Sequence, residues 1–287
     1  MRVRSPVVAG RFYPSRRADC VREIESCLPQ RLPSDLPSPI VAGIVPHAGW
    51  SFSGPTAAQV YAAIHSQRNP ATFVLLSAMH GWNALRPAVY GSGAWSTPLG
   101  EAPVDAELAR AVLDAGGGLL VDSPAAHDGE HSAEVQVPFI QHLFPQAHIL
   151  PILVPPDEGA VEVGAVLAQA VAAAQKDVVV IGTTDLTHYG AMYYGFAPAG
   201  KGAAALEWTR TNDARIIRLM LQMKAEDIVA ESRAHRNACG GGAVAATVAA
   251  ARALGAQKGV LLEYTTSHHV MPRGEATDFV GYAAVVF

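Results

Sequence analysis

Three of the eleven histidines follow closely on apolar runs that predict buried strands: His47, His80 and His188. A glycine stands within two residues of each, and glycine lets the backbone turn sharply or approach a ligand closely. A single histidine at a strand end is most often structural. Three of them are harder to explain that way, because ligands of open α/β sheets bind outside the carboxyl ends of the strands. The placement therefore predicts a site at one edge of a sheet.

Two further residues could join that site. Cys239 comes just before an apolar helix, where the helix dipole and free N–H groups favour a thiolate; it is either a nucleophile or metal ligand, or a small buried apolar residue. His131 precedes another predicted helix, for which Ser132 is a candidate N-cap. It is either an ordinary loop residue or a group that acts on an anionic or polarised substrate.

The chemistry available to these residue types is that of a metal centre or of acid–base catalysis. Two imidazoles and a thiolate suit iron, copper or zinc and leave coordination positions open. Asp185 lies three residues before His188, so the pair offers either a carboxylate that could orient an imidazole or a histidine that could act as an acid or base. His268 and His269 form a weaker metal pair, because neighbouring residues of a strand face opposite ways.

Alternation of apolar runs with helical stretches predicts the elements that must position these residues. Strands are expected at Ile40–Val45, Thr72–Ser77, His148–Val154, Asp177–Thr183, Val260–Thr266 and Val280–Phe287. Helices are expected at Arg16–Leu28, Pro55–His65, Asp105–Ala115, Val135–Phe144, Ala160–Gln175, Ala203–Met223, Glu226–Ser232 and Ala243–Leu254. Continuous apolar strands between helices predict an α/β fold, with a mostly parallel or mixed sheet covered by helices on both faces. The loop Ala191–Gly202 is either a lid over the site or a surface excursion.

Composition narrows the class of protein. The chain has 287 residues, 50% hydrophobic and 16% charged, with a formal net charge of -4 and no cluster of Lys and Arg, which argues against nucleic-acid binding. No apolar stretch reaches the roughly 18 residues of a membrane span, and no signal-peptide core is evident, so a cytoplasmic protein is expected. Three cysteines are too few for a disulfide framework. No internal repeat or domain linker is evident.

Several motifs occur together and in order along the chain: VPHAGWSFSG, the strand ending at His80, GEHSAEVQVPF followed by HILPILV, TTDLTHYG, and NACG before a helix. In this combination the sequence resembles the Memo family, whose bacterial and archaeal members are often called AmmeMemoRadiSam system protein B. That family is similar in fold to the class III extradiol dioxygenases (LigB-like). The resemblance implies one α/β domain over residues 1–287, with a cleft at the strand ends.

The resemblance also implies roles for individual residues. It assigns His47, His80 and Cys239 as the ligands of a metal ion, and the chemistry of these donors predicts iron or copper, with zinc as a further candidate. It places His188 as the catalytic acid or base with Asp185 beside it, and His131 in the same cleft.

Two departures from the dioxygenase pattern bear on the reaction. Cys239 stands where those enzymes have a carboxylate ligand, and a thiolate favours softer metal states such as Cu(I). Gly81 stands where Memo sequences often carry a second histidine, which removes a donor and widens the cleft.

Three functions follow as hypotheses. The first is a metal-dependent oxidoreductase. The second is a non-catalytic protein that recognises a peptide or partner in the same cleft, with Trp50 and Tyr189 as its aromatic walls. The ligand of the cleft is expected to be a small molecule or a peptide. The third is thiol chemistry by Cys239 without a metal or with zinc. The family name also associates these proteins with a radical-SAM protein and an AMMECR1-like protein, which implies a shared pathway.

Overall fold

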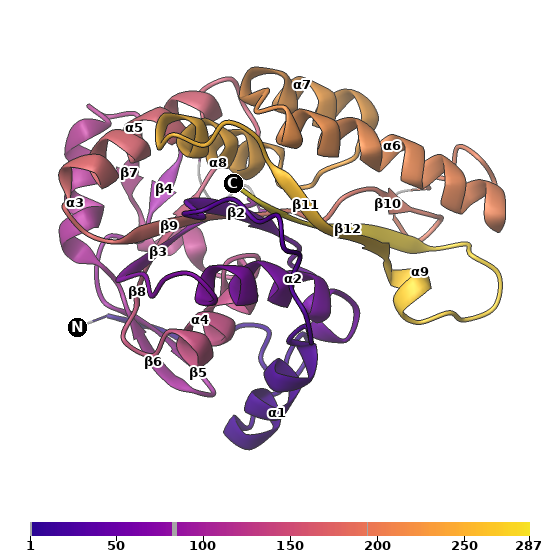
Figure 1. Ribbon diagram of the computed structural model, residues 1–287, viewed down its shortest axis with the longest axis horizontal. Coiled ribbons are helices and arrows are strands. Elements are labelled where there is room, and N and C mark those ends of the chain that lie inside the picture. The colour runs from indigo at the N-terminus through magenta and orange to yellow at the C-terminus, as the bar shows by residue number, and fades with distance from the viewer. Residues whose placement is uncertain (1, 82–84, 194) are drawn as a thin grey trace.

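A computed structural model describes residues 2–81, 85–193 and 195–287 (Figure 1), so residue 194 of the loop 191–202 lies outside the described residues. The strands are β1 Val3–Arg4, β2 Ala42–Val45, β3 Thr72–Ser77, β4 Ala88–Val89, β5 Ala94–Thr97, β6 Gly100–Pro103, β7 Val121–Asp122, β8 His148–Leu153, β9 Val178–Thr183, β10 His188–Tyr189, β11 Val260–Thr266 and β12 Phe279–Val286. The α-helices are α1 Arg17–Cys27, α2 Trp50–His65, α3 Ala106–Ala115, α4 Val137–Leu143, α5 Ala160–Ala173, α6 Ala203–Leu221, α7 Ala225–His235, α8 Gly241–Ala253 and α9 Ser267–Val270. Two 3₁₀ turns, η1 Pro124–His127 and η2 Glu134–Gln136, precede α4.

The main sheet is mixed, in the order β10-β12-β2-β9-β3-β8-β4-β7, with β11 paired to β12. Its centre, β2-β9-β3-β8, is parallel, and every residue of β2, β3 and β9 is buried. Helices α5 and α8 cover one face and α2 and α4 the other (Figure 1). These findings confirm the predicted α/β fold, because strands buried on both faces read as continuous apolar runs.

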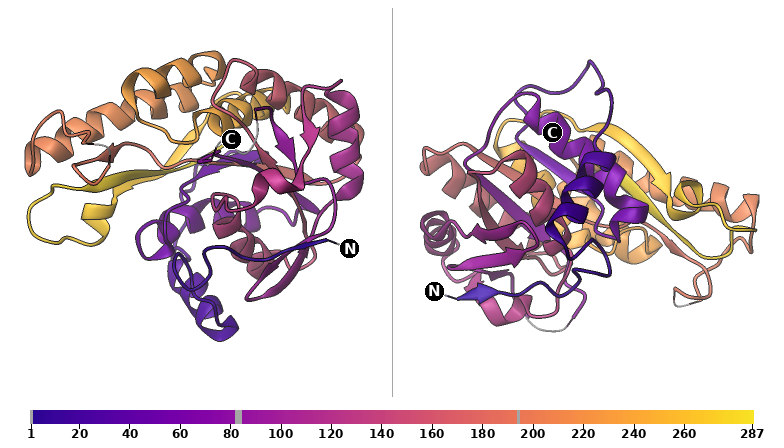
Figure 2. Two further views of the ribbon diagram at one scale, coloured as in Figure 1. Left: turned by 180° about the vertical axis from the view of Figure 1, so that it is seen from behind. Right: turned by 90° about the horizontal axis from the view of Figure 1, so that it is seen from below.

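A smaller sheet, β1-β5-β6, lies beside the main one, and β11 and β12 extend with α9 away from its body (Figure 2). The sequence did not predict β1, β4, β5, β6, β7 and β10. Four of them have only two residues each, which is too short to leave a periodic pattern.

Three local predictions were wrong. Helix α2 begins at Trp50 rather than at Pro55, because buried Trp50 packs 4.6 Å from the Phe139 ring and carries the helix back toward the strand end. Ser132 does not cap a helix; its hydroxyl donates to the Ala78 carbonyl at 3.2 Å. His268 and its neighbour lie in the short helix α9 rather than at the end of a strand, because the Thr266 side chain caps a new turn.

None of the helices within the described parts of the chain combines the length and apolar character needed to cross a membrane.

Candidate metal centre

The parallel order β2-β9-β3 brings three chemically active segments to one edge of the sheet. His47 follows the end of β2 by two residues, Asp185 follows β9 by two, and His80 follows β3 by three. The sequence predicted strand ends with histidines, and the strand order makes those ends neighbours.

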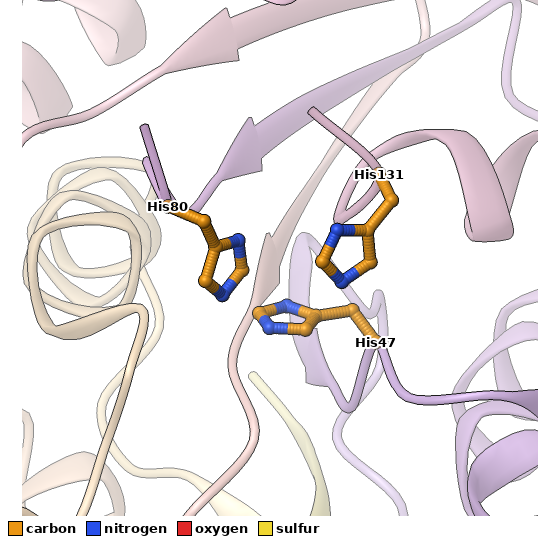
Figure 3. A group of neighbouring side chains, drawn as sticks. All are labelled: His47, His80 and His131. Carbon is orange, nitrogen blue, oxygen red and sulfur yellow. The ribbon is translucent and has the colours of Figure 1, made fainter. Parts of the chain in front are cut away.

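Three imidazoles meet at this edge (Figure 3). One ring nitrogen from each of His47, His80 and His131 lies within 4.8 Å of the others, close enough to hold a metal ion. The ring centroids are 5.1 Å apart for His47 and His80, and 4.8 Å apart for His80 and His131. His131, expected either as an ordinary loop residue or as a group that acts on substrate in the cleft, lies in the cluster itself.

Cys239 reaches the same cluster from the loop between α7 and α8. Its Sγ lies 3.1 Å from Nε2 of His47 and accepts a hydrogen bond from the Asp185 main-chain N–H at 3.3 Å. Gly240 permits this approach, because a Cβ at that position would lie 2.1 Å from the Thr183 carbonyl oxygen. The structure therefore gathers all three residues that the resemblance implies as ligands, with His131 as a fourth donor.

His47 is buried and held on its far side. Its Nδ1 lies 3.1 Å from Oγ1 of Thr183, which leaves Nε2 to face the cluster. Burial, together with the repulsion that a protonated His80 or His131 would exert, holds the pKa of His47 well below its usual range. Burial and the charge of His80 also lower the pKa of His131. Both rings are therefore neutral near pH 7, the form that binds metal.

His80 is bound to Glu130, a buried carboxylate in the loop directly before His131. Oε2 of Glu130 accepts the His80 main-chain N–H at 2.8 Å, and Oε1 accepts ring Nδ1–H at 3.0 Å. Burial opposes ionisation, but the hydrogen bonds and charge of His80 outweigh it and hold the pKa of Glu130 well below its usual range. Burial alone would lower the pKa of His80, yet hydrogen bonds to Cys239 and Glu130 raise it to about 10.

The side chains of Asp185 and His188 both form hydrogen bonds to main-chain groups. Oδ1 of Asp185 accepts the main-chain N–H of His47 at 2.8 Å, so the carboxylate holds the backbone after β2. Burial raises the pKa of Asp185. Nδ1 of His188 donates to the Leu186 carbonyl at 3.0 Å, so Nε2 is the ring nitrogen that remains for a ligand in the cavity. A backbone carbonyl therefore orients the His188 ring, and the Asp185 carboxylate binds the main chain of His47.

A cavity of about 1000 Å³ opens over the cluster, and both Asp185 and His188 line it. Its aromatic walls are Phe12, Phe52, Tyr193, Phe196 and Tyr282. The expectation that Trp50 and Tyr189 form these walls was wrong, because both are buried in the interior. The Trp50 indole N–H donates to the Val135 carbonyl, and the Tyr189 hydroxyl donates to the Gly200 carbonyl.

The loop 191–202 borders this cavity through Met192, Tyr193 and Phe196. A lid over the cavity would lie at this position, and the role of the loop as a lid remains a prediction. The pair His268 and His269 takes no part in the cavity lining; His269 Nδ1 lies 2.9 Å from the Thr266 hydroxyl.

Comparisons with known proteins agree with the fold and the motifs. The profile of the family described as Memo-like protein matches residues 4–286. The chain is 40% identical over 302 residues to the MEMO1 family protein TK1477 of Thermococcus kodakarensis, covering 99% of each chain. It is 35% identical over 295 residues to the MEMO1 family protein MK0963 of Methanopyrus kandleri, covering 99% of this chain and 98% of the relative.

Among solved structures, the uncharacterized protein JW3007 from Escherichia coli K12 is similar in fold, with a TM-score of 0.57 at 12% identity. The alignment covers 86% of this chain and 99% of that one. The profile match and the full-length relatives together show that this protein belongs to the Memo-like protein family.

Proposed function

We propose that the protein binds a transition-metal ion at this cluster, iron or copper with zinc as a further candidate, and uses it as an oxidoreductase. One observation carries the proposal: ligand atoms of His47, His80 and His131 lie within 4.8 Å of one another at the floor of a large cavity. The donor chemistry fits a metal, because the lowered pKa values of His47 and His131 keep two of the three rings neutral.

The identity of the third donor bears on the choice of metal. His47 and His80 are common to both candidate sets, and the third position falls to Cys239 or to His131. A thiolate favours softer states such as Cu(I), whereas three imidazoles suit zinc, copper or iron. When bound, a redox-active ion would supply electron transfer and open positions for substrate or dioxygen.

The residues of the chain supply the remaining chemistry. His188 is the proposed acid or base, because its Nδ1–H is engaged by Leu186 and, among the described residues, no hydrogen bond occupies Nε2 of this cavity-lining ring. Asp185 holds the main chain of His47 in place. The aromatic walls bind an apolar or aromatic part of the ligand and limit access of water to it.

Metal content tests the ligand assignment. Wild type and the single variants His47→Ala, His131→Ala and Cys239→Ala are purified anaerobically, and metal per chain is measured by mass spectrometry. We expect His47→Ala to lose most of its metal, and the greater loss between the other two identifies the third donor. His148→Ala, at an exposed position of β8, is the matched control and keeps its metal. Unchanged metal in both His47→Ala and Cys239→Ala refutes the assignment.

Oxygen uptake tests the reaction. Metal-free protein is loaded with Fe(II) or Cu(I) and supplied with catecholic probes. We expect turnover in wild type, and at least a hundredfold lower turnover with unchanged metal content in His188→Gln. Turnover that is unaffected by this substitution would remove His188 from the reaction.

The size and aromatic walls of the cavity also favour a second function, the binding of a peptide or partner without catalysis. The radical-SAM and AMMECR1-like proteins associated with the family are the candidate partners. Inactivity with every metal, combined with partner capture that is the same with and without metal and is lost in Phe52→Ala, would favour this alternative.

A further inference from the structure

We propose that Glu130 is the positioning residue of this centre: its carboxylate fixes the ring of His80 so that Nε2, and not Nδ1, is the metal-facing nitrogen. The inference rests on the proposed function, because it assigns a role to one of the proposed ligands. It adds a residue that touches neither metal nor substrate.

Glu130 holds His80 at two points. The main-chain N–H and the ring Nδ1–H both donate to the same carboxylate, at 2.8 and 3.0 Å. With Nδ1 engaged, Nε2 is the nitrogen left for the hydrogen bond of His80 with Cys239. The ring cannot turn over without breaking the bond to Glu130, so the carboxylate selects the nitrogen that enters the cluster.

The same carboxylate also organises the segment that carries His131. Oε1 of Glu130 accepts the main-chain N–H groups of His131 and Ser132, both at 2.8 Å. One side chain therefore joins the loop after β3 to the loop before η2. Two of the three clustered imidazoles are thereby placed relative to each other.

The main chain around Glu130 is bound by the buried Arg4 side chain. Nη2 of Arg4 donates to the Glu130 carbonyl at 2.6 Å, and Nε donates to the His127 carbonyl at 3.2 Å. The Glu130 side chain is only 5% exposed, so water cannot easily replace its donors. This support keeps the carboxylate in one position.

The expected consequence is a gain in metal affinity. A carboxylate that accepts the N–H of a ligating imidazole orients the ring and strengthens its other nitrogen as a donor, and loss of such a partner typically costs 10–100-fold in affinity. Glu130→Gln keeps the shape but replaces one acceptor oxygen with an NH₂ group, which cannot accept a hydrogen bond.

The test measures Zn²⁺ affinity of the full chain by competition with a chelator, for wild type, Glu130→Gln and Glu134→Gln. Glu134 is the matched control, a buried glutamate of the same segment that contacts the N-terminal residues rather than an imidazole. We expect 10–100-fold weaker binding in Glu130→Gln and less than a threefold change in folded Glu134→Gln. Equal affinity of wild type and Glu130→Gln overturns the positioning role.

A measurement on wild type covers the case in which Glu130→Gln does not fold. The ¹⁵N chemical shifts of the His80 ring, in Zn²⁺-loaded protein with labelled histidine, distinguish the metal-bound nitrogen from the N–H nitrogen. We expect Nε2 on the metal and Nδ1 protonated; Nδ1 on the metal overturns the proposal. If His47→Ala binds Zn²⁺ as tightly as wild type, the metal centre itself is refuted, which is a separate outcome.

Discussion

Glu130 and Glu134 lie four residues apart, and both are buried, yet they bind different parts of the molecule. The donors to the Glu130 carboxylate are the main chain and ring of His80 and the main-chain N–H groups of His131 and Ser132. The donors to Glu134 come from the N-terminal segment: Arg4 Nη1 at 2.7 Å, the main-chain N–H groups of Val7 and Val8 at 2.9 Å, and the Tyr13 hydroxyl at 3.0 Å.

The comparison shows that residue type and burial do not decide the role of a buried carboxylate; its donors do. Glu134 pairs with the buried Arg4 guanidinium and binds the N-terminal segment to the core, so its removal should lower the free energy of unfolding. Glu130 satisfies groups that belong to the candidate centre, so its removal should affect ligand binding. Arg4 donates to the Glu134 carboxylate and to the main-chain carbonyl of Glu130, whereas the Glu130 carboxylate accepts from His80, His131 and Ser132.

The largest effect on the free energy of unfolding is expected when the Glu134 carboxylate is removed. Glu134→Ala leaves the Arg4 guanidinium buried without its carboxylate, and such a loss costs about 3–5 kcal/mol. Urea unfolding at pH 7 should show this decrease in the free energy of unfolding. Glu158→Ala, at an exposed position, is the control and should stay within about 0.5 kcal/mol of wild type. A decrease below 1 kcal/mol for Glu134→Ala would contradict the structural role.

Asp213 is a third buried carboxylate, and its hydrogen-bond donors, Thr187 and Tyr264, are neutral. Burial raises its pKa to about 6, the opposite direction from Glu130. A raised carboxyl pKa means that the protonated form favours folding, so this stability is present below pH 4 and is lost as the pH rises through about 6.

Asp213→Asn should remove that pH dependence. Relative to wild type, the free energy of unfolding of the variant should increase by about 2–3 kcal/mol between pH 4 and pH 7.5. Urea titrations at half-unit pH steps measure the difference. Parallel pH profiles for the two proteins would show that Asp213 ionises normally.

Thr183 is the neutral counterpart of Glu130, because its hydroxyl bonds Nδ1 of His47 as the carboxylate bonds Nδ1 of His80. Thr183→Val leaves Nδ1 of a buried imidazole unpaired, which should lower the free energy of unfolding by about 1–2 kcal/mol. Thr183→Ser keeps the hydroxyl and should retain the wild-type Zn²⁺ affinity, which Thr183→Val should reduce. Equal affinities in both variants would remove Thr183 from the positioning of His47.

Gln175 provides a reference far from both glutamates. It is exposed after α5 with a φ of 49°, a left-handed conformation that favours glycine. Gln175→Gly should raise the free energy of unfolding by about 0.5 kcal/mol and leave Zn²⁺ affinity unchanged. Gln175→Ala, which keeps the Cβ, should match wild type, and a gain in that variant would show that the backbone strain is not the cause.

The sequence alone was sufficient to predict the α/β class, the central strands β2, β3, β8 and β9 to within two residues at either end, and the histidines that follow two of them. These features depend on local patterns, because a strand buried on both faces needs a continuous apolar run and a turn needs small residues. The motifs also predicted the family, which the profile match confirms.

Only the tertiary structure decided which residues share a site. Cys239 and His47 are 192 positions apart, and their contact depends on the strand order β2-β9 and on the close approach of Gly240 to β9. The same dependence explains why Trp50 was misplaced as a cleft wall and why Glu130 was missed. Burial and hydrogen-bond partners are set by segments distant in the chain, and no local spacing encodes them.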